Sequence, residues 1–333
     1  MFDGGAALRH EMRGMNVKAG TKPPIPSQFE QRLAYVASAA EHMLAISLGQ
    51  EPQAGEIARP KRLIEAMRHA VLNGGKRIRP MLVFETAALF GVSEPQAVHA
   101  GAAFELLHCY SLVHDDLPAM DNDEIRRGRP TVHKAYDEAT AILAGDALQT
   151  LAFEILSREA THRDPLVRVA LVQCLAYASG IGGMAGGQML DLEAEGRYAE
   201  DNRPPGLALA DIEKLQRMKT GALLAACCQA GGILGRAREM EMSAISRYGR
   251  AIGFAFQLAD DLLDAEGDAE EVGKAVGKDA AKNKATLVSA LGPIAAKRRL
   301  SDLIDEAKRA LYPFGERAEW LRSCADFIAA RKS

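Results

Sequence analysis

The stretch of sequence that decides the fold runs from Phe104 to Asp121 and reads FELLHCYSLVHDDLPAMD. It begins as a strongly apolar helical segment and ends in a group of carboxylates. On a regular helix Asp121 would lie about 240° around the axis from Asp115. Pro118 lacks the amide that would bond the carbonyl of His114. We therefore expect the helix to end or bulge at Pro118, which would bring Asp121 back to its partners.

A second acidic motif, Asp260-Asp261-Leu262-Leu263-Asp264, also follows an apolar helical stretch. Asp260 and Asp264 lie about 40° apart on one helix face. Acidic runs are commonly solvated helix faces, but unpaired carboxylates are costly to bury in an apolar helix, and close ones raise each other's pKa. Oxygen-only clusters suit a hard divalent cation that shares its ligand positions with phosphate oxygens. The two motifs together predict a shared magnesium site for a diphosphate.

The rest of the chain predicts an all-α fold. From Gln28 onward apolar residues recur at helical spacing, and no convincing period-two strand is present. Residues 1–27 are rich in proline towards their end and predict a loosely ordered extension. We expect residues 28–333 to form one domain, a single bundle of about ten or more helices. Turn signals place the breaks near residues 49–55, 73–75, 91–94, 122–131, 163–165, 196–206, 235, 267–277 and 292–293.

Composition limits the possible classes of protein but indicates no specific function. The chain has 333 residues, 48% of them hydrophobic, and a net charge of -3, which gives no indication of binding to nucleic acid. Its five cysteines lack metal-ligand spacing and lie in apolar helical segments, which favours reduced thiols in a cytoplasmic protein. No uninterrupted apolar run approaches the roughly 20 residues of a membrane span. We expect a cytoplasmic protein without a membrane-spanning segment.

Several basic segments are candidates for binding phosphate. Gly74–Pro80 places Lys76 and Arg79 after a double glycine, although a glycine helix stop followed by a basic turn would look the same. Arg126 and Arg127 follow the first acidic motif closely, where they could hold an anion that bridges the metals.

Other candidate residues lie on predicted helices or just after them. Lys219 and Thr220 fall on a helix predicted over 212–229, and Gln257 precedes Asp260 on the same face. A buried lysine beside carboxylates is also typical of a structural ion pair, and His108 could equally be a packed core residue. The glycine- and lysine-rich stretch 267–284 could close over a diphosphate or be a solvated loop.

In this order, these motifs resemble the trans-isoprenyl diphosphate synthase family, from about Gln28 to the C-terminus. Within that family the resemblance is nearest to bacterial-type farnesyl diphosphate synthases, which carry two extra residues in the first acidic motif. The segments that carry the resemblance are residues 74–80, 108–128, 144–148 (AGDAL), 187–191 (GQMLD), 219–221 (KTG) and 257–264.

The resemblance implies the isoprenoid synthase fold, in which helices surround a deep cavity, usually in a homodimer. About three magnesium ions would hold an allylic diphosphate, with manganese as a possible substitute. Their ligands would be Asp115, Asp121 and Asp260, helped by Asp116, Asp261 and Asp264. The allylic diphosphate would also be held by Arg126, Lys219, Thr220, Gln257 and Lys274. Isopentenyl diphosphate would be bound by Lys76, Arg79, His108 and Arg127. The residues expected to act most directly in the chemistry are Asp115, Asp121, Arg126, Lys219 and Asp260.

The implied reaction is the head-to-tail condensation of isopentenyl diphosphate with dimethylallyl or geranyl diphosphate. In this family a bulky aromatic residue near position 110 forms a floor that stops chain growth. Tyr110 and Ser111 therefore favour farnesyl diphosphate as product, while a geranyl or geranylgeranyl diphosphate synthase remains an alternative. A terpene cyclase or a non-catalytic synthase subunit is a more distant alternative, because Lys76, Arg79 and all six aspartates are present.

Overall fold

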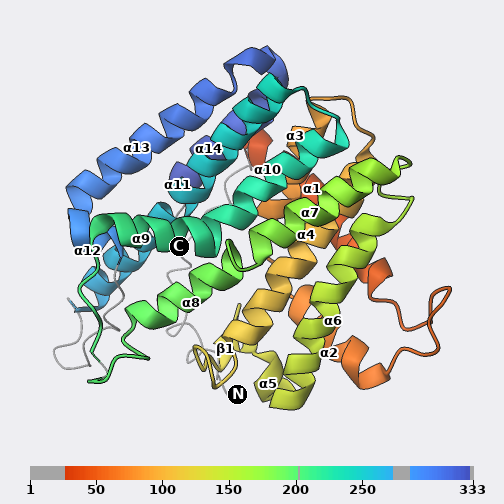
Figure 1. The fold of residues 1–333 in the computed structure, drawn as a ribbon, viewed down its shortest axis with the longest axis horizontal. Coiled ribbons are helices and arrows are strands. Elements are labelled where there is room, and N and C mark those ends of the chain that lie inside the picture. The colour runs from red at the N-terminus through yellow and green to blue at the C-terminus, as the bar shows by residue number, and fades with distance from the viewer. Residues whose placement is uncertain (1–26, 202, 273–285, 331–333) are drawn as a thin grey trace, which may run out of the picture.

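The computed structural model describes residues 27–201, 203–272 and 286–330, and side chains are described for all of these except 266–272. The predicted extension 1–27 therefore lies outside the described residues except for Ser27. Within the described part the chain is a bundle of helices with one two-stranded hairpin (Figure 1). The prediction of an all-α fold is confirmed.

The helices in chain order are α1 (Gln28–Ser47), α2 (Lys61–Val71), α3 (Ile78–Ala88), α4 (Glu94–Asp115), α5 (Val132–Ala135), α6 (Glu138–Ser157), α7 (Pro165–Ser179), α8 (Met184–Ala194), α9 (Leu209–Gln216), α10 (Ala222–Leu234), α11 (Glu239–Val272), α12 (Leu287–Leu291), α13 (Pro293–Ala310) and α14 (Glu319–Ala329). A π-helical segment, Arg217–Gly221, joins α9 to α10, and a 3-10 segment, Tyr312–Ala318, precedes α14. The hairpin pairs β1 (Ile125–Arg126) with β2 (Arg129–Pro130).

Local sequence signals explain where several helices begin. Ser27 and Glu30 form a capping box at the start of α1, in which each side chain bonds the backbone amide of the other residue. Asp137 caps α6 by accepting from the amide of Thr140. Asp164 caps α7, whose first residue is proline, the position where proline is best tolerated. The starts of α1 and α7 agree with the predicted boundaries at residues 27–28 and 163–165, whereas α6 begins seven residues after the predicted break over 122–131.

Two helices form the centre of the bundle. Along α4 every residue from Ala100 to Leu107 is buried, and α10 is buried on nearly all sides. A helix that is apolar all round has to be surrounded by others. In Figure 1, α13 and α14 lie on one side of this centre, and α2, α5 and α6 lie on the other.

Three local predictions need correction. The break predicted over 267–277 begins too early, because α11 continues through Gly267 to Val272; residues 273–277 lie outside the described residues. A glycine inside a helix costs only about 1 kcal/mol relative to alanine. The single helix predicted over 212–229 is α9, the π-helical segment and the start of α10. The turn at Gly180–Gly183, which separates α7 from α8, was not predicted.

Two apolar runs meet the length and composition of a membrane span. They are Glu138–Ser157 and Pro165–Ala194, with 39% and 33% of their most apolar windows buried. Length and apolar composition are weak evidence for a membrane span, because the core helix of a soluble protein can have both. The second run is also broken at Gly180–Gly183, which leaves α7 only 15 residues long, shorter than the roughly 20 that a span needs.

Candidate active site

The first acidic motif lies where α4 ends. The helix ends at Asp115, and the amide of Asp121 donates to the carbonyl of Asp115 at 2.8 Å. The predicted helix end before Pro118 is therefore confirmed, and the loop folds Asp121 back towards Asp115. Burial raises the pKa of Asp115 to about 6, although the nearby Lys219 ammonium lowers it. A carboxylate in this position is stabilised by added positive charge.

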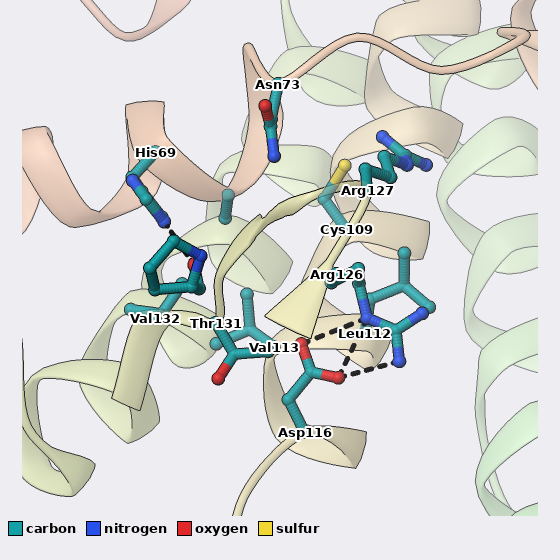
Figure 2. Close-up of a pocket in the computed structure, with 12 residues that line it drawn as sticks. His69, Asn73, Cys109, Leu112, Val113, Asp116, Arg126, Arg127, Thr131 and Val132 are labelled. Carbon is teal, nitrogen blue, oxygen red and sulfur yellow. Dashed lines mark hydrogen bonds and ion pairs between the residues drawn. The ribbon is translucent and has the colours of Figure 1, made fainter. Parts of the chain in front are cut away.

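Asp116 faces the opposite side of the motif and is paired inside the protein. The Arg126 guanidinium holds its carboxylate in a two-pronged ion pair, with Nη2 2.7 Å and Nε 2.8 Å from Oδ1 (Figure 2). Arg126 lies on β1, and Thr131 supports the hairpin by donating to the carbonyl of Asp123 at 2.8 Å. Burial still raises the pKa of Asp116, against the lowering effect of Arg126. This pair fixes the hairpin to the end of α4.

The basic loop before α3 places its cationic side chains in different environments. Arg77 is buried in a left-handed backbone conformation, and its guanidinium donates to Glu105 at 2.7 Å and to the carbonyl of Val71 at 2.6 Å. It is thus a structural residue, whereas Lys76 is exposed. A side chain at Gly75 would meet the guanidinium of Arg127, since a Cβ there would lie 2.8 Å from Nη1. The glycine allows Arg127 to lie directly on the loop, where it donates to the carbonyl of Gly74.

Arg79 and His108 both line one cavity. The Nε of Arg79 is buried and has no hydrogen-bond partner among the described residues. Burial, followed by the nearby Arg79 and Arg127 charges, lowers the pKa of His108 well below its usual value. The imidazole is therefore neutral at neutral pH, and the surrounding arginines favour an anion there.

Lys219 lies on the π-helical segment, and α8 holds it. Its ammonium donates to Asp191 at 2.5 Å. Burial lowers the pKa of Lys219, but the Asp191 carboxylate raises it by more, so the pKa lies above its usual value. One helical turn before Asp191, Gly187 contacts the backbone of Lys219, and a Cβ there would lie 2.2 Å from that amide nitrogen. π-helical turns inside α-helices are often functional, and here one carries two predicted site residues, Lys219 and Thr220.

The second acidic motif on α11 is tied to the same segment. Asp261 is buried and accepts from Gln216 at 2.6 Å and from Gln257 at 2.9 Å. The amide oxygen of Gln257 in turn accepts from the hydroxyl of Thr220 at 2.8 Å. Asp264 is exposed and Asp260 is partly buried. Lys274, with the other lysines of the predicted closing loop, lies outside the described residues.

One cavity of about 630 Å³ brings many of the predicted residues together. The predicted residues in its lining are Arg79, His108, Tyr110, Ser111, Asp115, Lys219 and Thr220. The rest of the lining is mostly apolar and comes largely from α8, the 117–120 loop and Ile142 of α6. A second, much smaller pocket of about 30 Å³, room for about one water molecule, is lined by Asp116, Arg126 and Arg127 (Figure 2). Lys76, Asp121, Asp260, Asp264 and Gln257 line neither.

The donor chemistry of the acidic motifs fits a hard cation. Both motifs offer oxygen alone, which suits magnesium. Among the described residues, no group of three or more His, Cys, Asp or Glu side chains is arranged to hold an ion by itself. Magnesium commonly keeps waters and takes phosphate oxygens as further ligands. Asp116 and Asp261 are each held by side chains of the protein, whereas Asp115 lines the cavity.

Sequence reasoning did not assign roles to Asp191, Gln188 or Gln216. Asp191 and Gln188 fall within the segment 187–191 that was recognised as a motif, so a signal for them existed. Gln216 gave no such signal, because its partner Asp261 is far away in sequence and adjacent only across the helix interface.

A family model described as polyprenyl synthetase matches residues 60–310. The chain belongs to this family. The match spans both acidic motifs, the basic loop before α3 and the π-helical segment.

Individual relatives are similar over most of the chain. The farnesyl diphosphate synthase of Escherichia coli (strain K12) is 44% identical over 277 residues, which cover 81% of this chain and 89% of that protein. A dimethylallyltranstransferase of Fischerella ambigua is 43% identical over 274 residues, 82% of this chain and 77% of that protein. Among solved structures, an FPP/GFPP synthase from Zymomonas mobilis has a TM-score of 0.79 and 45% identity, covering 91% of this chain and 99% of that one. The helical architecture is therefore the fold of prenyl synthases.

Proposed function

We propose that this prenyltransferase condenses isopentenyl diphosphate with dimethylallyl and geranyl diphosphate to give farnesyl diphosphate. The observation that carries the proposal is the single cavity in which Asp115, Lys219 and Thr220 meet Arg79 and His108. Asp115, Lys219 and Thr220 suit a diphosphate that is bound together with metal. Arg79 and the neutral His108 suit a second diphosphate that is bound without metal. Two diphosphates at one apolar cavity are what a chain-elongating synthase requires.

The metal would be held by Asp115 and Asp121 of the first motif and by Asp260 and Asp264 of the second, with Asp116 and Asp261 as supports. When bound, magnesium would neutralise charge that develops on the departing allylic diphosphate. Lys219, Arg126, Thr220 and Gln257 would help to bind that group, together with Lys274.

The second substrate would be held so that its double bond faces the allylic carbon. Arg79, His108, Arg127 and Lys76 would bind the diphosphate of isopentenyl diphosphate, and the neutral His108 would do so as a hydrogen-bond donor. Loss of the allylic diphosphate leaves a carbocation, which the double bond of isopentenyl diphosphate attacks. The new cation then loses a proton, for which the released diphosphate is a suitable acceptor. The apolar cavity wall excludes water that would otherwise capture either cation.

Tyr110 is proposed as the floor that limits product length, with Ser111 beside it. Both line the cavity, and Ser111 is anchored by donating to the carbonyl of His108 at 2.9 Å. The relatives leave room for other lengths, because a geranylgeranyl pyrophosphate synthase of Capsicum annuum is also 40% identical. Product length therefore has to be measured.

The decisive experiment offers labelled isopentenyl diphosphate, magnesium and one allylic diphosphate of five, ten or fifteen carbons per reaction. We expect a fifteen-carbon product from the two shorter starters and little extension of the fifteen-carbon one. Chelation of the metal should abolish turnover, and added magnesium should restore it. A twenty-carbon product would mean that the residue that stops chain growth lies deeper in the cavity than Tyr110. No condensation with any starter would favour a cyclase or a non-catalytic subunit.

The metal assignment predicts that Asp115→Ala or Asp260→Ala lowers turnover by about a hundredfold or more, as loss of an essential electrostatic group does. Circular dichroism should show an unchanged helical content, because Asp115 is the last residue of α4, and at position 260 inside α11 alanine is a better helix former than aspartate. Near-normal turnover in both variants would contradict the assignment.

We also propose that the chain acts as a cytoplasmic homodimer, with residues 28–333 as the catalytic domain. All five cysteines are free and buried, in keeping with a reducing compartment. The exposed side of α7 carries Leu166, Val169 and Tyr177, which are 76%, 63% and 72% exposed. These residues lie within about 80° on one helix face, and Leu143 of α6 is also 57% exposed. A second copy of the chain is the occupant that family membership favours for this face.

A further inference from the structure

His114, the residue before the first aspartate, is seated directly on a glycine of the neighbouring helix. A Cβ placed on Gly145 of α6 would lie 2.1 Å from Nε2 and 2.4 Å from Cδ2 of His114. The imidazole therefore fills the space that a side chain at position 145 would take. Because α4 and α6 pack closely along their length, this contact is part of a tight helix interface.

A hydrogen bond sets the orientation of the His114 ring. Its Nε2 lies 3.1 Å from the carbonyl of Ile142, one turn before Gly145 on α6. The carboxylate of Asp146 is 3.9 Å away, too far for a hydrogen bond. To bond a carbonyl, Nε2 must carry the proton. The Nε2 side of the ring is thus held against α6.

Tyr110 lies one helical turn before His114 and packs against it. The two ring centroids are 5.2 Å apart with an interplanar angle of 82°, an edge-to-face contact of the kind that aromatic rings prefer. Tyr110 and His114 both line the cavity. The imidazole of His114 therefore supports the ring of Tyr110, and α6 supports the imidazole.

We propose that His114, seated on Gly145, positions the ring of Tyr110 and thereby sets the length of the product. The inference rests on the proposed role of Tyr110 as the cavity floor. Removing the imidazole opens a space over Gly145 into which the tyrosine ring can turn, which deepens the cavity. Adding a methyl group at position 145 pushes the imidazole towards Tyr110, which makes the cavity shallower. The two changes act in opposite directions.

The test compares products of the variants His114→Ala, Gly145→Ala and the double variant with those of the unchanged protein. With a five-carbon starter, we expect His114→Ala to raise the ratio of twenty- to fifteen-carbon product about tenfold, the usual effect of a small change in an apolar pocket. Gly145→Ala should raise the ratio of ten- to fifteen-carbon product to a similar extent. In the double variant the methyl group occupies part of the vacated space, so the fifteen-carbon product should recover.

Gly235→Ala is the matched control. A Cβ at Gly235 would lie 2.2 Å from Cβ of Phe90, so it displaces an aromatic side chain as Gly145→Ala does, but Phe90 does not line the cavity. We expect its product distribution to match that of the unchanged protein. Equal shifts in Gly235→Ala and Gly145→Ala would overturn the inference, because product length would then report general destabilisation.

The variant Tyr110→Ala tests the proposed floor role of Tyr110 separately from the positioning role of His114. If Tyr110→Ala lengthens the product while His114→Ala, Gly145→Ala and the double variant all keep the normal distribution, the floor stands and the role of His114 is refuted. If Tyr110→Ala also leaves the product unchanged, both assignments fail. Should Gly145→Ala prove too unstable to assay, His114→Ala alone still decides, since it removes atoms and adds no clash.

Discussion

At the level of single residues, the acidic motifs contain aspartates with two different roles. Asp116 and Asp261 are buried and each is bonded by side chains of the protein. Asp115 lines the cavity, and its raised pKa reflects burial that only nearby positive charge offsets. Carboxylates whose oxygens accept several internal hydrogen bonds are poor candidates for metal ligands. The two inner aspartates therefore hold their helices in place, whereas Asp115 is open to the cavity.

The positioning role of Asp261 predicts a loss of stability in Asp261→Asn. The carboxylate accepts from Gln216, Gln257 and the backbone amide of Leu287. In asparagine one oxygen becomes an amide nitrogen that faces a donor, which should lower the free energy of unfolding by about 1–3 kcal/mol. Denaturant unfolding measures this change. Asp264→Asn, at an exposed position on the same helix, should leave the free energy of unfolding unchanged, and equal effects would contradict the role of Asp261.

The sequence could predict which residue types gather at the site but not which of them pair. The closeness of Arg126 to the first motif was visible, and an anion was the expected partner. In the structure Asp116 is that partner, because the hairpin turns the guanidinium back towards α4. Likewise Arg77 stands next to the candidate Lys76 in the sequence, and only the fold shows that Arg77 is buried against Glu105. Pairings of this kind depend on tertiary contacts that spacing alone does not encode.

At the level of elements, the junction of α8 with the π-helical segment determines where Lys219 lies. Gly187 allows the two backbones to approach, and Asp191 on the same face of α8 then reaches the ammonium. The helical nature of this region was predictable from apolar periodicity. The π-helical turn was not predictable, because it differs from an α-helical turn by only one extra residue in each hydrogen-bonded ring and has no characteristic amino-acid composition.

This junction predicts that Gly187→Ala impairs both stability and activity. Its methyl group would lie 2.2 Å from the amide nitrogen of Lys219, and backbone cannot rotate away as a side chain can. Overpacking of this kind costs about 1–3 kcal/mol, and displacement of Lys219 should lower kcat and raise the KM for the allylic diphosphate. Thermal unfolding and steady-state kinetics measure the two effects. Gly182→Ala is the control, because a Cβ there meets nothing within 4 Å; normal kinetics in Gly187→Ala would show that the junction does not position Lys219.

At the level of the whole molecule, the exposed apolar face of α7 is the feature that a single chain leaves unexplained. Its opposite face, including Val167, Leu171 and Leu175, is buried in the bundle. A helix with apolar residues on both faces normally packs on both sides. This also explains why α6 and the run containing α7 are apolar enough to resemble membrane spans: part of their apolar surface is covered by the bundle, and the rest is available to a second copy.

The proposed homodimer predicts that charge on this face separates the subunits without unfolding them. In Leu166→Asp/Val169→Asp both positions are exposed in the single chain, and an acidic residue at the start of a helix is favourable, so each subunit should stay folded. Burying two unpaired carboxylates in an apolar interface is costly, and each 1.4 kcal/mol weakens association about tenfold. Light scattering at micromolar concentration should therefore give the mass of a dimer for the unchanged protein and of a monomer for the variant. Ile294→Asp, which charges a residue 88% exposed on α13, should remain dimeric. A dimeric double variant would place the interface elsewhere, and a monomeric unchanged protein would refute the homodimer itself.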